Sequence, residues 1–290
     1  MTLPAPGYLD LDGVRSRYVA SGDPAAPPVL LLHGIGRSLE DMSGLAARLT
    51  PGYRVISVDL PGFGLSDGLA GGYSLEGLAR GVLASLDAMA ERRPVHVVGN
   101  SLGGAVAMQL SVLAPERVKS LTLIDSAGFG SEVTIALRLL SLGPIGAILL
   151  RRKTRDTAYR TERALFADRK FVTEERIRHA LAVGANPAYD GAFLATTRFL
   201  GTIRGVRPGW RSRLLAIVAA QRKPTLIVWG DQDRILPANH AGNARELLPH
   251  ARVHIYEKCG HMPQIEREEE FAALAREFIT GVEQQWPGER

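Results

Sequence analysis

The sequence predicts an α/β fold in which a doubly wound, mostly parallel sheet is covered by helices on both faces. Short, almost continuously apolar segments alternate with helix-like segments along most of the 290 residues. This is the pattern of strands that are buried on both sides and joined by helical crossovers. The alternation stops between residues 131 and 207, where the composition is helical. We therefore expect a core made of residues 1–130 and 208–290, with a helical cap inserted at 131–207.

The first strands are expected to form an antiparallel hairpin. Tyr8–Leu11 and Val14–Ala20 flank Asp12-Gly13, a pair typical of tight hairpin turns. Six later segments have the length and apolar content of buried strands. They are Val29–Leu32, Arg54–Leu60, Pro94–Val98, Val118–Asp125, Thr225–Trp229 and Arg252–Tyr256.

Five segments between or after these strands predict helices. They are Leu39–Leu49, Leu75–Ala90, Leu102–Ala114, Ala238–Leu248 and Glu268–Val282. Ser38, with Asp41 three residues later, predicts a capping box, and Ser74 predicts a second N-cap. Pro115 and Pro249 mark the ends of two of the helices.

Composition excludes several classes of protein. Hydrophobic residues make up 46% and charged residues 22%, which are ordinary globular proportions. The single cysteine, Cys259, excludes a disulfide framework. No histidine–carboxylate cluster has metal-ligand spacing and Gly34-x-Gly36 is no dinucleotide fingerprint, so we expect no metal and no organic cofactor. No signal peptide is visible, and the longest apolar stretch, Leu139–Leu150, is too short to cross a bilayer. We expect a cytoplasmic protein.

The net charge of +5 is concentrated in one segment. Residues 131–207 carry 14 Lys/Arg and 7 Asp/Glu, which gives +7 and leaves −2 for the rest. Such a segment attracts anionic substrates, phospholipid surfaces or nucleic acid, but solvated helix faces in an arginine-rich chain give the same pattern. No nucleic-acid signature accompanies it, so no nucleic-acid partner is expected. Membrane contact is expected at most at the surface, through the run Arg151-Arg152-Lys153-Thr154-Arg155.

The strongest local motif joins a strand to a helix. Pro94–Val98 runs directly into Gly99-Asn100-Ser101-Leu102-Gly103-Gly104. This is G-x-S-x-G at a strand–helix junction, where a sharp turn exposes a nucleophilic serine. The glycines leave room for the turn and for the close approach of the helix. Ser101 is the predicted nucleophile, and the helix N-terminus beneath it favours negative charge.

A serine nucleophile needs a base that takes its proton and an acid that orients the base. His261 lies in the loop Cys259-Gly260-His261-Met262-Pro263 after the last predicted strand. The chain order serine, acid, histidine singles it out among seven histidines. The acid is expected after Thr225–Trp229, where both Asp231 and Asp233 are candidates. Turn formation is the alternative role for each.

Acyl transfer also needs backbone N–H groups for the oxyanion. We expect the amide of Leu102, which follows the nucleophile, and the amide of Ile35 in the loop His33-Gly34-Ile35-Gly36. Further residues are expected around the substrate: His33, Gly34, Gly36, Asn100 and Met262. Of these, His33 is expected to brace the loop and to take no part in proton transfer.

Taken together, these residues resemble the α/β-hydrolase family over about residues 8–130 and 208–283. The similarity rests on His33-Gly34, Asp59-Leu60-Pro61-Gly62-Phe63-Gly64-Leu65-Ser66, the Ser101 elbow, Trp229-Gly230-x-x-Asp233 and Gly260-His261. In that family the aspartate of W-G-x-x-D usually completes the triad, which implies Asp233. The resemblance also implies a helical cap after the sixth strand, where 131–207 falls.

The resemblance implies a serine hydrolase acting on a small-molecule substrate, an apolar carboxylic ester. Gly99-Asn100-Ser101 and Lys258-Cys259-Gly260-His261 are also similar to meta-cleavage-product hydrolases, which cut carbon–carbon bonds in ring-fission diketones. The loop Gly34-Ile35-Gly36-Arg37 lacks the proline of those enzymes, and only Arg178 and Arg198 are candidates for their cap arginine. A third hypothesis is a hydrolase-fold receptor that binds a ligand with little turnover.

Overall fold

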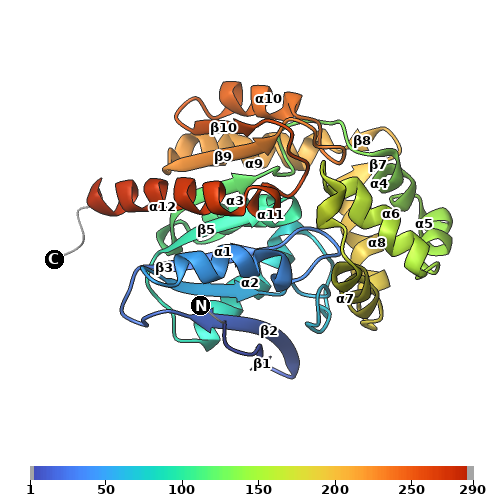
Figure 1. Ribbon diagram of the computed structural model, residues 1–290, viewed down its shortest axis with the longest axis horizontal. Coiled ribbons are helices and arrows are strands. Elements are labelled where there is room, and N and C mark those ends of the chain that lie inside the picture. Colours follow the sequence, from blue (N-terminus) through green and yellow to red (C-terminus); the bar gives the residue numbers. More distant parts are fainter. Residues whose placement is uncertain (1–2, 286–290) are drawn as a thin grey trace.

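The computed structural model describes residues 3–285 and contains one eight-stranded sheet (Figure 1). The strand order is β1-β2-β4-β3-β5-β6-β9-β10. The pairs β1–β2 and β2–β4 are antiparallel, and all other neighbours in this sheet are parallel. The strands are β1 (Gly7–Leu11), β2 (Val14–Ser21), β3 (Pro28–Leu32), β4 (Arg54–Val58), β5 (Val95–Asn100), β6 (Val118–Ile124), β9 (Thr225–Gly230) and β10 (Arg252–Tyr256). The predicted mostly parallel sheet with an opening hairpin is confirmed.

Helices cover both faces of the sheet. One face carries α1 (Ser43–Leu49) and α12 (Glu268–Gln285). The other carries α2 (Leu75–Ala88), α3 (Leu102–Leu113), α9 (Pro208–Gln221) and α10 (Asn239–Leu247). A short helix, α11 (Pro263–Glu266), precedes α12. Within residues 3–285, no helix combines the length and the apolar character needed to span a bilayer.

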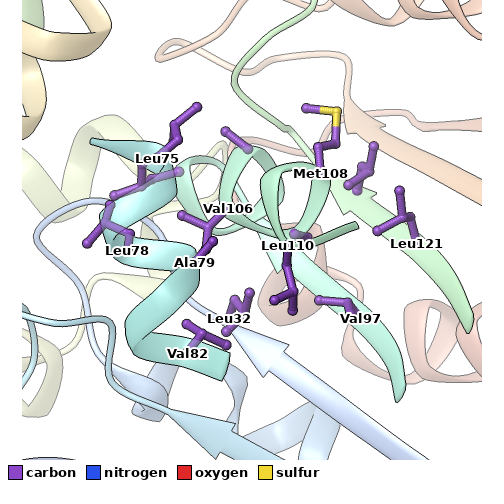
Figure 2. Close-up of a cluster of buried hydrophobic side chains, with 14 of the residues drawn as sticks. Leu32, Leu75, Leu78, Ala79, Val82, Val97, Val106, Met108, Leu110 and Leu121 are labelled. Atoms are coloured by element: carbon purple, nitrogen blue, oxygen red, sulfur yellow. The ribbon is translucent and has the colours of Figure 1, made fainter. Parts of the chain in front are cut away.

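The larger apolar core lies between the sheet, α2 and α3 (Figure 2). In α2, Leu75, Leu78, Ala79 and Val82 recur at helical spacing and turn one buried face inward. In contrast, α3 is buried almost all round because it packs against α2, α9 and the sheet. Each fully buried aliphatic side chain stabilises the fold by about 1.5–3 kcal/mol. The helix that follows the elbow is therefore held rigidly.

Two expectations at the first helix are corrected by tertiary contacts. The predicted helix Leu39–Leu49 is a 3₁₀ turn, η1 (Leu39–Met42), followed by α1. The capping box at Ser38 is wrong, because its hydroxyl is hydrogen-bonded with Nε2 of His179 (2.6 Å) and caps no backbone N–H. The N-cap predicted at Ser74 is confirmed.

The β4 strand ends at Val58, two residues before the predicted end at Leu60. The chain turns at Asp59, whose carboxylate accepts the backbone N–H of Leu39 (2.7 Å) and Leu65 (2.8 Å). A buried aspartate that ties two loops together thus ends the strand.

We call residues 131–207 the cap segment. It contains α4 (Ile135–Leu140), α5 (Gly143–Leu150), α6 (Arg155–Leu165), α7 (Glu174–Gly184) and α8 (Tyr189–Leu200). These helices gather at one end of the sheet, on the right in Figure 1. The segment is not helical throughout, as its composition led us to expect, because β7 (Gly201–Thr202) and β8 (Gly205–Val206) form an antiparallel pair. The domain boundaries stay a prediction, and residues 1–2 and 286–290 of the predicted core lie outside the described residues.

Candidate active site

The predicted nucleophile lies where the strand order reverses. β3 is flanked by β4 on one side and by β5 on the other, and the chain passes from β5 through Ser101 into α3. Crevices at such switch points are where open α/β sheets bind ligands. Ser101 has φ 56° and ψ −114°, a strained conformation for a residue with a side chain.

The glycines around Ser101 make this turn possible. A Cβ at Gly99 would lie 2.3 Å from the carbonyl oxygen of Gly103, and one at Gly103 would lie 2.4 Å from that of Leu32. At Gly104 it would meet the Ser126 hydroxyl at 2.3 Å. Backbone atoms cannot move aside, so the first two positions require glycine. The third glycine makes room for the loop after β6.

Ser101 and His261 line the same cavity, which has a volume of about 320 Å³. Among the described residues the Ser101 hydroxyl has no hydrogen-bond partner. The core side of the wall includes Gly34, Ile35, Gly36, Asn100 and Met262, and the cap side includes Leu137, Leu140, Leu150, Tyr189 and Phe193. The cap segment thus covers the predicted nucleophile.

The structure separates the two candidate acids. Nδ1 of His261 lies 2.7 Å from Oδ2 of Asp233, and both side chains are buried. Oδ1 of Asp233 accepts the N–H of Ile235 (2.7 Å) and Leu236 (3.1 Å). Asp231 is exposed and accepts the N–H of Cys259 instead (3.2 Å). An ionised Asp233 places the imidazole proton on Nδ1 and leaves Nε2 free to accept a proton.

The residues that carry the predicted oxyanion donors line a second, smaller cavity. Ile35, Ser101 and Leu102 all line a mainly apolar space of about 60 Å³. The Ile35 loop turns back through a hydrogen bond from the Arg37 N–H to the Gly34 carbonyl (3.3 Å). These positions suit stabilisation of charge on a carbonyl oxygen beside Ser101.

His33 supports this loop from behind and lines neither cavity. Its Nε2 accepts the N–H of Leu60 (2.9 Å), so its Nδ1 donates to the Gly34 carbonyl (2.8 Å). Burial lowers the pKa of His33, which keeps the ring neutral. Its predicted place beside the substrate is corrected, since both ring nitrogens serve the backbone.

A family model described as alpha/beta hydrolase fold matches residues 27–268. The chain belongs to the α/β-hydrolase family. It is 33% identical over 94% of its length, and 69% of the relative's, to the dihydrolipoyllysine-residue acetyltransferase component of the acetoin cleaving system of Cupriavidus necator. It is 31% identical to the 2-hydroxy-6-oxo-6-phenylhexa-2,4-dienoate hydrolase of Comamonas testosteroni, with 93% of each chain covered. A solved bacterial membrane phospholipase A superposes with a TM-score of 0.78 at 27% identity, covering 96% of this chain and 86% of its own.

In this α/β-hydrolase a second buried aspartate lies beside Asp233 and His261 and was missed from the sequence. Asp125 follows β6 with φ 41°, and its Oδ1 accepts the N–H of Gly230 (3.0 Å). One side-chain atom each of Asp125, Asp233 and His261 lie within 4.8 Å of one another. Burial and the neighbouring Asp233 charge raise the pKa of Asp125 well above its usual value.

Asp125 and Asp233 place two carboxyl groups in one buried site. Burial and the charge of Asp233 favour the protonated form of Asp125. The three groups also have the spacing of metal ligands. The available sequence signal for Asp125 was its position at the carboxyl end of the strand next to β5, where ligand-site residues gather.

Glu266 is the other missed residue, and it joins the histidine loop of the hydrolase to the cap segment. Its Oε1 accepts the N–H of Gly260 (2.6 Å), and its Oε2 accepts the N–H of Ala167 (3.0 Å) and Asp168 (3.1 Å). The N–H of His261 itself donates to the carbonyl of Leu165 at the end of α6 (2.8 Å). The end of α6 therefore positions the histidine.

A group of four charges, two buried carboxylates and two half-buried guanidinium groups, fixes the same part of the cap segment to the loop after β3. Asp41 accepts from Arg37 (2.6 Å) and from Arg176 of α7 (2.6 Å). Glu162 of α6 bonds Arg176 (2.9 Å) and also Arg37. The two guanidinium groups hold the pKa of Asp41 well below its usual range despite its burial. We call these four residues the ionic quartet.

Proposed function

We propose that this protein is a serine hydrolase of carboxylic esters, with Ser101 as nucleophile, His261 as base and Asp233 as the orienting acid. The observation that carries the proposal is the 2.7 Å contact between Asp233 and His261 beside the cavity that Ser101 lines. The family resemblance of the whole chain supports a hydrolase.

The proposed reaction proceeds through an acyl-enzyme. Nε2 of His261 takes the Ser101 proton as Oγ attacks the ester carbonyl carbon. The N–H groups of Ile35 and Leu102 stabilise the oxyanion. The tetrahedral intermediate collapses as the C–O bond breaks, and the alcohol leaves with the proton from His261. Water, activated by His261, then cleaves the acyl-enzyme and regenerates the serine.

The walls of the two cavities support an apolar ester with one short and one longer group. The 60 Å³ cavity is lined mainly by apolar side chains, including Ala127, Val133 and Trp210. The 320 Å³ cavity is lined largely by cap aliphatics and aromatics. Arg37, which also lines this cavity, is already paired with the carboxylates of Asp41 and Glu162. The membrane phospholipase A among the solved neighbours, by its name an enzyme that acts on phospholipids, supports ester cleavage.

Carbon–carbon cleavage is the second candidate, favoured by the similarity to the dienoate hydrolase over 93% of both chains. Such a substrate carries a carboxylate that needs a cation in the cavity. The two arginines suggested for that role lie elsewhere. Arg178 is exposed and donates to the Glu174 carbonyl, and Arg198 lines a groove outside the cavity. Two other arginines do line the cavity, Arg37 and Arg160. Arg37 is paired with Asp41 and Glu162, and Arg160 is paired with Asp156. Because both cations already have carboxylate partners, the lining supports an uncharged ester.

The test compares wild type with Ser101→Ala on p-nitrophenyl butyrate. We expect kcat to fall about a million-fold, because the nucleophile is lost. Ser111→Ala is the matched control, since Ser111 lies on α3 outside both cavities and donates to the Met108 carbonyl. Undiminished hydrolysis by Ser101→Ala would rule out the proposed mechanism.

Substrate class is tested separately by kcat/KM for the ester and for a ring-fission diketone. A large preference for the diketone would establish carbon–carbon cleavage instead. Ligand-induced thermal stabilisation with negligible turnover of either compound would favour the receptor hypothesis.

A further inference from the structure

A second concave site lies outside the catalytic cavity, between α8, the β7–β8 pair and the start of α9. This groove has a volume of about 800 Å³. Its lining contains four arginines and no carboxylate: Arg198, Arg204, Arg207 and Arg211. Across residues 3–285, no carboxylate forms a salt bridge with any of the four. Exposed arginines are ordinarily solvated, so the informative residue is Arg211, the least exposed of the four.

Arg211 is half-buried, and part of its guanidinium group is shielded from water without a partner. Its Nε and Nη1 atoms have almost no solvent contact and no hydrogen-bond partner, and burial lowers the pKa of its guanidinium. The nearby carboxylate of Glu132 is hydrogen-bonded with His240 (3.0 Å) and forms no ion pair with Arg211. Buried polar atoms without hydrogen-bond partners are rare in native structures, so these two atoms of Arg211 call for an explanation.

The start of α9 gives a second, independent observation at the same place: positive side chains lie at a helix N-terminus, which disfavours positive charge. The helix has 14 residues, begins at Pro208 and receives no side-chain cap from Arg207. Its first residues, Pro208 to Arg211, line the groove. The N-terminus of a helix favours anions and disfavours cations, yet the sequence places arginines at both ends of this first turn. Local conflicts of this kind concentrate at functional sites.

We propose that this groove binds a phosphate group carried by an organic molecule. A phosphate would pair with the unpartnered guanidinium and accept from the uncapped helix start. Guanidinium groups bind phosphate oxygens in pairs, and several cations together suit a multiply charged group better than a single carboxylate. The volume exceeds that of a phosphate alone, and Phe199, Pro208 and Trp210 offer apolar surface to the organic part.

The groove adjoins the smaller of the two cavities that Ser101 lines. Thr202, Val206 and Trp210 line both the groove and the 60 Å³ cavity beside Ser101. A ligand in the groove therefore contacts the outer side of the cavity wall. The proposal does not depend on the proposed ester hydrolysis, because binding is measured without turnover.

The first experiment measures binding of glycerol 3-phosphate by calorimetry, and co-sedimentation with phosphatidylcholine vesicles with and without phosphatidic acid. Wild type is compared with the double variant Arg204→Gln/Arg207→Gln. The matched control is Arg213→Gln, an exposed arginine of α9 outside the groove lining. We expect the double variant to weaken binding at least about tenfold, the control to bind as wild type does, and added salt to weaken wild-type binding.

Each outcome of that experiment decides something. Groove-dependent binding of glycerol 3-phosphate identifies a free phosphoester as the source of the phosphate. Groove-dependent binding of phosphatidic acid vesicles alone identifies a lipid headgroup. The proposal is overturned if wild type binds neither probe, or if Arg213→Gln weakens binding as much as the double variant does.

The variant Arg211→Met tests the site through Tm, and the folded protein is not expected to lose stability from this substitution. Without phosphate, the Tm of this variant is expected to equal or exceed that of wild type, because an unpaired desolvated charge is replaced by a side chain of similar length. The rise in wild-type Tm caused by glycerol 3-phosphate should disappear in the variant. A rise that survives Arg211→Met, or a lower Tm of the variant without phosphate, would contradict the site.

Discussion

The two halves of the cap segment are attached to the core in different ways. α6 and α7 are fixed by the ionic quartet and by the hydrogen bond from His261 to the Leu165 carbonyl. In contrast, α4 has no buried residue and α5 buries only Gly146, while Ile135 is 70% exposed and Ile148 is 58% exposed. Both halves line the cavity.

This difference points to two roles, one in positioning the predicted catalytic loops and one in selecting the substrate. The anchored half holds the loops that carry the predicted base and the oxyanion donor. The loosely attached half contributes aliphatic wall and packs against α8, but it buries almost none of its own residues, as expected of segments with low local stability. We therefore infer that α4 and α5 adapt to the substrate while α6 and α7 stay with the core.

The largest effect on kcat is expected at Asp233, the predicted orienting acid, whose partner His261 is held by the anchored half. Asp233→Asn should lower kcat for p-nitrophenyl butyrate about ten-thousand-fold, because the amide no longer fixes the tautomer of His261. Asp231→Asn should leave kcat near that of wild type, since Asp231 contacts only the loop backbone. Equal losses in the two variants would show that the triad is assigned wrongly.

The ionic quartet provides the next contrast. Glu162→Gln removes a buried carboxylate, leaves two half-buried guanidinium groups with one carboxylate, and should lower the free energy of unfolding by about 3 kcal/mol. Glu174→Gln breaks the exposed pair with Arg155 and should cost less than about 1 kcal/mol. Urea denaturation measures both. Similar values for the two variants would mean that the ionic quartet anchors α6 and α7 no more strongly than an exposed ion pair does.

A smaller effect is expected at Asp125. Asp125→Asn keeps the shape of the neutral acid, so kcat at pH 7 should change by less than about fivefold. The raised pKa of Asp125 means that the folded state holds a proton that the unfolded chain releases, so this group makes wild type less stable as pH rises above about 4. The variant should gain stability relative to wild type between pH 5 and pH 8. A relative loss over that range would indicate an ionised Asp125.

The smallest effect on stability is expected in the loosely attached half. Ile148→Ser on α5 should change the free energy of unfolding by less than about 0.5 kcal/mol, because the side chain is already 58% exposed. The inference that α5 adapts is tested at Leu150, which lines the 320 Å³ cavity. Leu150→Ala should raise KM for long-chain p-nitrophenyl esters and leave KM for the acetate unchanged. A drop in kcat for the acetate would place α5 among the positioning elements.

Local pattern was sufficient to predict the sheet and the elbow. β10 was predicted to the residue, and the glycines around Ser101 signalled the strained turn because backbone crowding there permits no Cβ. The choice of Asp233 over Asp231 needed the family resemblance, since both aspartates follow the same strand. The structure distinguishes the two, because the side chain of Asp233 contacts His261 whereas Asp231 is exposed.

The rest depended on contacts between distant parts of the chain. Glu162 meets Arg37 across 125 positions, and Ser38 meets His179 across 141, so no local pattern could signal either pair. The helix α9 was missed although it buries Leu214, Leu215 and Val218. Sequence reasoning therefore predicted the catalytic loops better than the contacts that support them.

The most direct test of the account is covalent labelling with a fluorophosphonate, located by peptide mass mapping. The account predicts a single adduct on Ser101, formed much more slowly in Asp233→Asn and absent from Ser101→Ala. An adduct on another serine, or none in a preparation that hydrolyses esters, would contradict it.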